Sequence, residues 1–158
     1  MHGKLFHEAV ISAPANKVWD IYSTPKLGHL INQSLTSFLN VELLNGDGGE
    51  GSAVMIKFQS GAAPLVERVT KIDNENRIKV AELIEGCFLE IGFQLYRLSY
   101  EIIEKEANIS IVKTTIEYEI EEQFISNVVF LTTKPFEAFA TVVDLYLTEK
   151  SHVIFPEN

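Results

Sequence analysis

One broad apolar stripe at helical spacing runs through the last part of this chain, and it constrains the fold more than any other feature. Between residues 123 and 151, apolar side chains recur every three or four positions: Phe124, Val128, Leu131, Phe139, Val142 and Tyr146, widened by Phe136, Ala140, Val143 and Leu147. This spacing predicts a long amphipathic helix, which Pro135 should kink or break into two parts. Such a wide face must lie against another apolar surface of similar size.

The preceding segments predict a sheet that can supply this surface. A first strand is expected over residues 4–11, and six more follow at about 38–44, 52–59, 64–72, 77–84, 88–103 and 109–121. In the last of these, Val112 and Ile116 alternate with charged residues such as Lys113, which indicates one covered and one wet face. We expect the C-terminal helix to pack on the covered face.

Two short helices are predicted between the first and second strands. Pro14 suits the beginning of a helix over residues 15–22, with Ser12 as a candidate cap, and Pro25 should end that helix. A second helix is predicted over residues 26–34. The chain is therefore expected to be one α+β domain over residues 1–158, with a sheet wrapped around one long helix.

A glycine-rich loop, Asn45–Gly51, lies between two of the predicted strands. Its glycines could expose consecutive N–H groups to an anion. A phosphate-binding loop would also need a Lys-Ser/Thr pair followed by a helix. Here the chain continues as a predicted strand, and Asp47 and Glu50 add negative charge to the loop. A tight hairpin is the favoured interpretation.

Composition and charge exclude several classes of partner. The chain has 158 residues, of which 46% are hydrophobic, and a formal net charge of -9. Negative charge argues against nucleic acid and anionic membrane as partners. No apolar run approaches the ~20 residues of a membrane span. No secretory signal is visible, so a cytoplasmic location is expected.

Metal and disulfide chemistry are also disfavoured. A single cysteine, Cys87, cannot form an internal disulfide. The histidines, His2, His7, His29 and His152, are scattered without the spacing of metal ligands. We therefore expect neither a metal nor a cofactor.

Several motifs resemble the birch-pollen-allergen-like family of plant proteins, also called pathogenesis-related class 10 proteins. They are the order of elements and the segments at residues 18–23, 46–51 and 132–135. Within that family, residues 72–79 and 83–86 are similar to the norcoclaurine synthase and norbelladine synthase branch. The resemblance covers nearly the whole chain. It implies a helix-grip fold, with a seven-stranded antiparallel sheet, a gripped C-terminal helix, two short helices and a large internal cavity.

The resemblance also implies a chemistry for that cavity. Norcoclaurine synthase joins an arylethylamine to an aldehyde through an iminium ion and then closes a ring, using an inward tyrosine, glutamate, lysine and aspartate. In this sequence Glu67 and Lys79 stand at the glutamate and lysine positions. Leu65 replaces the tyrosine and Leu98 replaces the aspartate. A related reaction that needs one base and one cation is therefore expected, with Glu67 and Lys79 as its catalytic residues.

Whether Glu67 and Lys79 meet depends on a hairpin. Leu65, Glu67 and Val69 share one strand face, where burial should raise the pKa of Glu67 unless a cation partners it. A five-residue loop over residues 72–76 would make Glu67 and Lys79 diagonal neighbours, roughly 7 Å apart at Cβ, whereas a four-residue loop would separate them. An ordinary cross-strand ion pair remains the alternative to a catalytic pair.

The strand predicted over residues 88–103 supplies further cavity candidates. Phe88, Glu90, Gln94, Tyr96, Leu98 and Tyr100 alternate onto one of its faces. A helix broken at Pro135 cannot fill the concave sheet, so a void of ~300–1,000 Å³ should remain. The expected ligand-binding residues are Leu65, Val69, Phe88, Glu90, Tyr96, Leu98, Phe136 and Phe139.

Three functional classes are consistent with these residues. The first is a cofactor-free cyclase or condensing enzyme of plant specialised, alkaloid-type metabolism. The second is a non-catalytic carrier of small hydrophobic plant metabolites or hormones, and the third is a defence protein without one dedicated ligand. An inward acid and ammonium favour the enzyme, while Leu65 and Leu98 favour the carrier. In each of the first two classes the partner is a small hydrophobic or aromatic plant metabolite.

Overall fold

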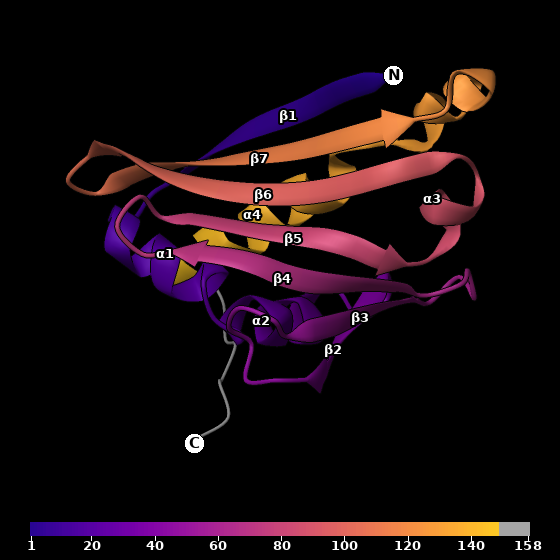
Figure 1. Ribbon diagram of the computed structural model, residues 1–158. Helices are drawn as coiled ribbons and strands as arrows, with labels where there is room; N and C mark the ends of the chain where they lie inside the picture. Colours follow the sequence, from indigo (N-terminus) through magenta and orange to yellow (C-terminus); the bar gives the residue numbers. More distant parts are fainter. Residues whose placement is uncertain (149–158) are drawn as a thin grey trace.

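The computed structural model describes residues 1–148, which form a seven-stranded antiparallel sheet with helices on its inner side (Figure 1). The strands are β1 (His2–Ile11), β2 (Leu39–Asn45), β3 (Ala53–Phe58), β4 (Leu65–Asp73), β5 (Ile78–Glu85), β6 (Phe93–Glu106) and β7 (Ile109–Ile120). Their order across the sheet is β1-β7-β6-β5-β4-β3-β2. The sheet implied by the resemblance is confirmed.

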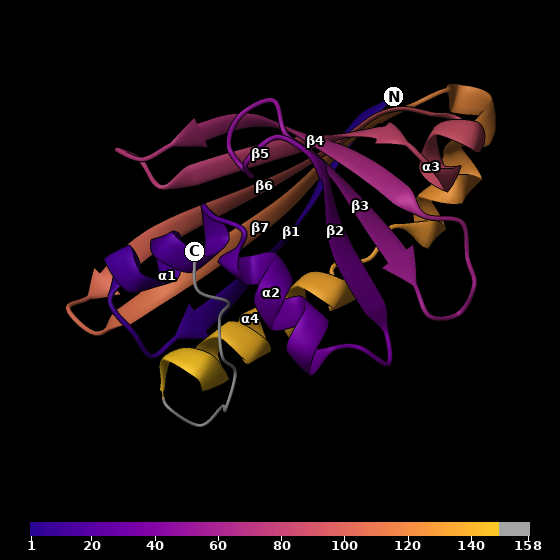
Figure 2. The same cartoon turned by 90° about the horizontal axis from the view of Figure 1, so that it is seen from below.

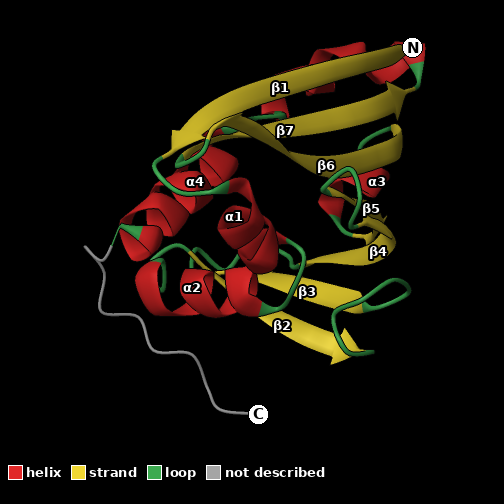
Figure 3. Ribbon diagram, turned by 90° about the vertical axis from the view of Figure 1, so that its left-hand side faces the viewer, coloured by secondary structure: helices red, strands yellow, loops and turns green. Residues whose placement is uncertain are grey.

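The helices gather on one side of this sheet. They are α1 (Ala15–Tyr22), α2 (Lys26–Ser34), α3 (Cys87–Glu90), the 3-10 helix η1 (Glu122–Phe130) and α4 (Lys134–Leu147). Figure 2 shows α4 crossing beneath the sheet, and Figure 3 shows the sheet curving from β1 to β2 around the helices. The two short helices predicted over residues 15–22 and 26–34 are confirmed.

Burial of the apolar stripe explains the position of α4. Its buried residues are Phe139, Ala140, Val142 and Val143. They join one core with the inner-face residues of the central strands, among them Ile116 of β7 and Leu98 of β6. The carboxylate of Asp144 also accepts a hydrogen bond of 2.8 Å from the backbone N–H of Ser12, which ties α4 to the end of β1. The predicted packing of the helix across the sheet is confirmed.

The predicted break of the C-terminal helix into two parts near Pro135 is confirmed, but the first part is a 3-10 helix and not an α-helix. Residues 122–130 form η1, and Leu131 is extended with φ -74° and ψ 137° before α4 begins at Lys134. Pro135 stands in the first turn of α4, where a missing N–H leaves no hydrogen bond unmade. It therefore marks a new helix after a break. The last predicted helical residues, 149–151, lie outside the described residues.

The strand predicted from residue 88 also begins later than expected. Gly86 and Gly92 have φ of 134° and 104°, conformations that favour glycine. They enclose the short helix α3, and β6 begins only at Phe93. The predicted face holds only from Tyr96 onward, because the register shifts between Phe93 and Leu95 and leaves Gln94 exposed. Phe88 and Glu90 come from a different element.

The loop interpretation is confirmed and the capping prediction is wrong. In the glycine loop, the N–H of Gly48 donates to Ser52 Oγ at 2.9 Å and that of Gly49 donates to Asp47 Oδ1 at 2.8 Å. Oxygen atoms of the loop therefore occupy the donors that an anion would need. At α1, the residue before the helix is Pro14, and no side-chain hydrogen bond from Ser12 caps it.

Candidate functional site

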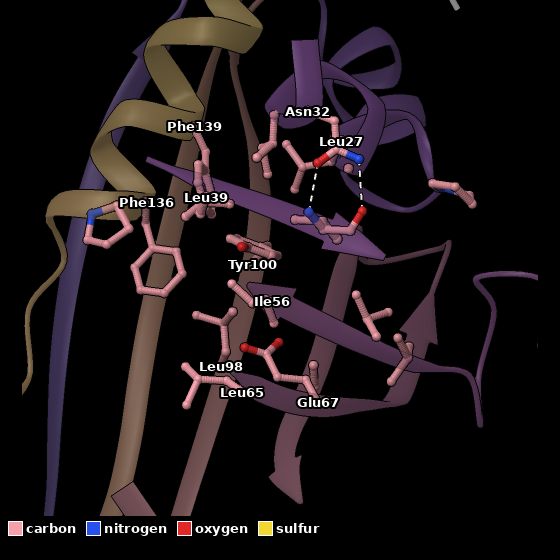
Figure 4. Close-up of a pocket in the computed structure, with 18 of the residues that line it drawn as sticks. Leu27, Asn32, Leu39, Ile56, Leu65, Glu67, Leu98, Tyr100, Phe136 and Phe139 are labelled. Carbon is pink, nitrogen blue, oxygen red and sulfur yellow. Dashed lines mark hydrogen bonds between the residues drawn. The ribbon is translucent and has the colours of Figure 1, made fainter. Parts of the chain in front are cut away.

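A cavity of about 410 Å³ lies between the inner face of the sheet and the helices α2 and α4 (Figure 4). Its volume falls within the expected range. Its wall is mainly apolar and includes Leu27 of α2, Leu39 of β2 and Ile56 of β3. Of the expected ligand-binding residues, those that line it are Leu65, Val69, Phe88, Tyr96, Leu98, Phe136 and Phe139. Glu67 and Lys79 line it as well.

Glu90 does not line this cavity. It is exposed at the end of α3, because residues 87–90 form a helical turn in place of the predicted strand. Phe88 of the same turn still reaches the cavity and stacks on Tyr96, with ring centroids 5.0 Å apart and planes 13° apart. The prediction that Glu90 shares an inward strand face with Tyr96 is therefore wrong.

A β-bulge brings Glu67 and Lys79 to the same side of the sheet. The hairpin pairs Asp73 with Ile78, which leaves a four-residue loop over residues 74–77. In a regular ladder this loop would put Glu67 and Lys79 on opposite faces. The register shifts between Val69 and Lys71, so one extra residue on β4 restores the shared face. The observed register therefore differs from both alternatives considered from the sequence, the five-residue loop and the four-residue loop in a regular ladder.

The observed register also separates the two charges. Glu67 lies opposite Leu83 and Lys79 opposite Ile72, with the pair Val69 and Ala81 between them. Within residues 1–148 no direct ion pair joins the two side chains. Instead, Lys79 Nζ donates a hydrogen bond of 3.1 Å to the backbone carbonyl of Tyr22, the last residue of α1. The alternative of an ordinary cross-strand ion pair is therefore wrong.

Burial perturbs both groups in opposite senses. Desolvation raises the pKa of Glu67 from 4.5 to about 7, although the Lys79 charge partly counteracts this rise. Desolvation lowers the pKa of Lys79, which the Glu67 charge partly counteracts. The Glu67 carboxyl has no hydrogen-bond partner among residues 1–148, and its accessible surface faces the cavity. Its carboxyl can therefore take or give a proton near neutral pH.

Two further tyrosines carry hydroxyl groups in this region. Burial, followed by the charge of Glu67, raises the pKa of both Tyr96 and Tyr100. Tyr100 was not among the expected ligand-binding residues, although its alternation with Tyr96 and Leu98 places it on the same strand face. That alternation could have identified Tyr100 as a cavity residue from the sequence.

Asn32 is another cavity residue that the sequence did not single out. Its side-chain amide donates to the carbonyl of Val41 at 2.8 Å and accepts from the N–H of Val41 at 2.7 Å. Figure 4 shows this pair of bonds between α2 and β2. Because both polar atoms of the amide are used in this contact, Asn32 supports the cavity wall by joining helix to sheet.

Among residues 1–148, no group of three or more histidine, cysteine, aspartate or glutamate side chains could hold a metal ion. In the same range, no helix is long and apolar enough to cross a membrane.

The fold and site define an antiparallel sheet that grips a helix over an internal cavity with one acid and one ammonium. The chain belongs to the pathogenesis-related protein Bet v 1 family, whose family model matches residues 1–150. It is 38% identical over 154 residues to norbelladine synthase of Narcissus pseudonarcissus, covering 95% of this chain and 94% of that protein. It is 30% identical to S-norcoclaurine synthase 1 of Papaver somniferum, covering 96% of this chain and 68% of that protein.

Solved structures show the same relationship. A norcoclaurine synthase structure from Thalictrum flavum, in complex with dopamine and hydroxybenzaldehyde, superposes with a TM-score of 0.85 at 27% identity. The match covers 96% of this chain and 89% of that one. A point mutant of that enzyme with a transition-state analogue gives a TM-score of 0.86 at 28% identity, covering 96% and 98%. The expected branch is confirmed, and with it the class of a norcoclaurine-synthase-like condensing enzyme.

Proposed function

We propose that this protein condenses a primary arylethylamine with an aldehyde through an iminium ion, and that Glu67 and Lys79 carry the proton transfers. The observation that supports this most directly is a carboxyl with a pKa of about 7 in a cavity that also holds a separate ammonium group. A carrier of apolar ligands has no need of two buried ionisable groups, which cost free energy to desolvate. A general base whose pKa lies near the working pH is what the condensation requires.

In the proposed reaction, the carboxylate of Glu67 takes a proton from the arylethylammonium ion. The free amine nitrogen then attacks the aldehyde carbon, and a carbon–nitrogen bond forms as the carbonyl electron pair moves to oxygen. Lys79 gives a proton to that oxygen and recovers one from the nitrogen. The proton held by Glu67 finally converts the hydroxyl to water, which leaves as the carbon–nitrogen double bond forms. The ammonium ion and the aldehyde thus yield an iminium ion and one water.

Leu65 and Leu98 shape the substrate range in this proposal. Both line the cavity at positions where the norcoclaurine synthase pattern has a tyrosine and an aspartate. Their side chains cannot bind or deprotonate a phenol, so the cavity should orient its substrates mainly by shape. It should favour a reactant less polar than a catechol pair.

The test is turnover of dopamine and hydroxybenzaldehyde, with borohydride trapping of the iminium ion as a secondary amine. Glu67→Gln should lower turnover by roughly 10²–10⁴-fold, the range for loss of a general base, while ligand affinity stays nearly unchanged. Glu90→Gln is the matched control, because Glu90 is exposed outside the cavity. Chiral analysis of any cyclised product separates enzymatic ring closure from the uncatalysed reaction. Wild-type turnover by Glu67→Gln would refute the assignment.

A carrier is the second candidate, supported by the apolar character of most of the cavity wall. If this function is the correct one, small aromatic metabolites should bind saturably, and the rate of the condensation should equal the rate without protein. Leu65→Ala should then change which ligand binds. Under the enzyme proposal, the same substitution changes substrate preference and leaves the proton transfers in place.

A further inference from the structure

Tyr100 is a buried ionisable residue of the cavity that the proposed proton transfers leave unused. Its residue is only 7% exposed, and its side chain lines the cavity from β6 (Figure 4). Within residues 1–148 its hydroxyl has no hydrogen-bond partner. Among residues 1–148, the side-chain polar atom that is both fully buried and without a hydrogen-bond partner is the hydroxyl of Tyr22, not that of Tyr100. The hydroxyl of Tyr100 is therefore not fully enclosed, and its accessible surface lies where the residue meets the cavity.

The register places Tyr100 beside Lys79. The two residues are directly paired between β5 and β6, and both side chains point to the cavity face. Directly opposite residues in an antiparallel pair have Cβ atoms about 4.5–5.5 Å apart. A phenol hydroxyl and an ammonium group can therefore reach the same small region of the cavity.

Tyr22 holds both of these donors in place. Its backbone carbonyl accepts the hydrogen bond from Lys79 Nζ, which leaves two further N–H donors on the ammonium group. Its ring contacts the ring of Tyr100 edge-on, with centroids 4.9 Å apart. On its other side Tyr100 contacts Phe136 of α4, with centroids 6.3 Å apart. Both donors are thus positioned before any ligand binds.

We propose that the Tyr100 hydroxyl, together with the Lys79 ammonium group, binds the carbonyl oxygen of the aldehyde substrate. This inference rests on the proposed function and assigns a contact within it. Two donors aimed at one oxygen stabilise the negative charge that develops there as the amine attacks. Burial holds the pKa of Tyr100 well above its usual range, so the hydroxyl stays protonated and acts as a donor.

The assignment orients the substrates in the cavity. The aldehyde oxygen lies toward Lys79 and Tyr100, at the end of the cavity near α1. The amine nitrogen lies toward Glu67, which is separated from Lys79 along the hairpin by the pair Val69 and Ala81. Tyr100 then supplies a hydroxyl in a cavity where Leu65 replaces the tyrosine of the norcoclaurine synthase pattern.

The test measures the carbonyl stretching frequency of isotope-labelled hydroxybenzaldehyde bound without amine, by infrared difference spectroscopy. In the wild-type protein the band should lie below that of the free aldehyde in buffer. In Tyr100→Phe the lowering should be partly lost, with affinity roughly three- to tenfold weaker. With dopamine present, kcat should fall roughly 10²–10³-fold. Tyr118→Phe is the control, because Tyr118 is buried and does not line the cavity.

The outcomes separate this inference from the function on which it rests. If Tyr100→Phe binds the aldehyde with the wild-type frequency and affinity, the Tyr100 assignment is wrong and the condensation proposal stands. If the wild-type protein shows no saturable binding of the aldehyde, both are wrong. Repeating the measurement with benzaldehyde, which lacks the ring hydroxyl, shows whether Tyr100 binds the carbonyl or the hydroxyl of the ligand. If Tyr100→Phe weakens the binding of hydroxybenzaldehyde but not that of benzaldehyde, then Tyr100 binds the ring hydroxyl of the ligand and not its carbonyl oxygen. That result would also overturn the assignment.

Discussion

Replacing Glu67 by glutamine should stabilise the folded protein above neutral pH, even though it removes the proposed base. Burial raises the pKa of this carboxyl in the folded state from 4.5 to about 7. The folded state therefore holds the Glu67 proton more tightly than the unfolded chain does. The stability that this proton binding contributes is complete below pH 4.5 and is lost as the pH rises to about 7. Glutamine is neutral throughout, so the variant should not lose it.

The magnitude follows from the size of the pKa change. One pKa unit corresponds to about 1.4 kcal/mol, so ionising the buried carboxyl costs the folded protein at most about 3 kcal/mol. The charge of Lys79 is already contained in the pKa of about 7, and any water that enters the cavity would reduce this value further. For a chain of this length, 1 kcal/mol shifts the melting temperature by about 2–4 °C. The variant should therefore melt up to roughly 6–12 °C above the wild type at pH 8.

Thermal unfolding between pH 4 and pH 8, monitored by circular dichroism, gives the melting temperatures of the variant and of the wild type at each pH. The difference between Glu67→Gln and the wild type should be small near pH 4.5, grow up to about pH 7 and then level off. Glu90→Gln should show no such growth, because Glu90 is exposed in the folded protein. A difference that stays constant across this range would show that the Glu67 carboxyl is solvated as well in the folded state as in the unfolded one. The pKa argument for Glu67 as a base would then fail.

Lys79 and Tyr22, which share a hydrogen bond, are the subjects of two further predictions. The kcat/KM of the wild type should rise with pH through about 7 as Glu67 ionises, and Lys79→Met should lower activity and move this rise to higher pH, because Lys79 lowers the pKa of Glu67. A pH–rate profile of both proteins checks this, and an unshifted profile would contradict it. Tyr22→Phe should raise the free energy of unfolding by about 1 kcal/mol, because it removes a buried hydroxyl without a partner. Urea unfolding measures this change, and a loss of stability would show that the hydroxyl is hydrogen-bonded.

The periodicity of apolar residues predicted the helices and strands whose buried face is set by residues close together in the sequence. Helical spacing and the flanking prolines placed α1 and α2 correctly, and alternation identified the inner face of β7. The same patterns failed where one spacing of apolar residues is compatible with two types of secondary structure. Apolar residues over 122–130 suit a helical stripe, yet they form η1. The run at 87–90 suits a strand, yet glycines at both ends let it turn into α3.

The candidate site was only partly predictable for the same reason. The sequence identified Glu67 and Lys79 through a resemblance and through strand faces, and it identified most of the cavity wall through alternation. The β-bulge near Thr70 is not encoded by any local pattern, yet it decides that both side chains point inward. A bulge depends on which ladder buries more apolar surface, and here it turns Ile72 toward the core and leaves Lys71 exposed.

The sequence by itself determined the types of element, the apolar faces and the presence of one acid and one ammonium among cavity residues. Only the tertiary structure decided how these groups are held. Lys79 is fixed by a carbonyl 57 residues away, and Tyr100 is held between Tyr22 and Phe136, which come from opposite ends of the chain. Propensity and periodicity act over a few residues, whereas the pKa of Glu67 arises from desolvation by the whole cavity. That desolvation exists only once the sheet has closed around the helix.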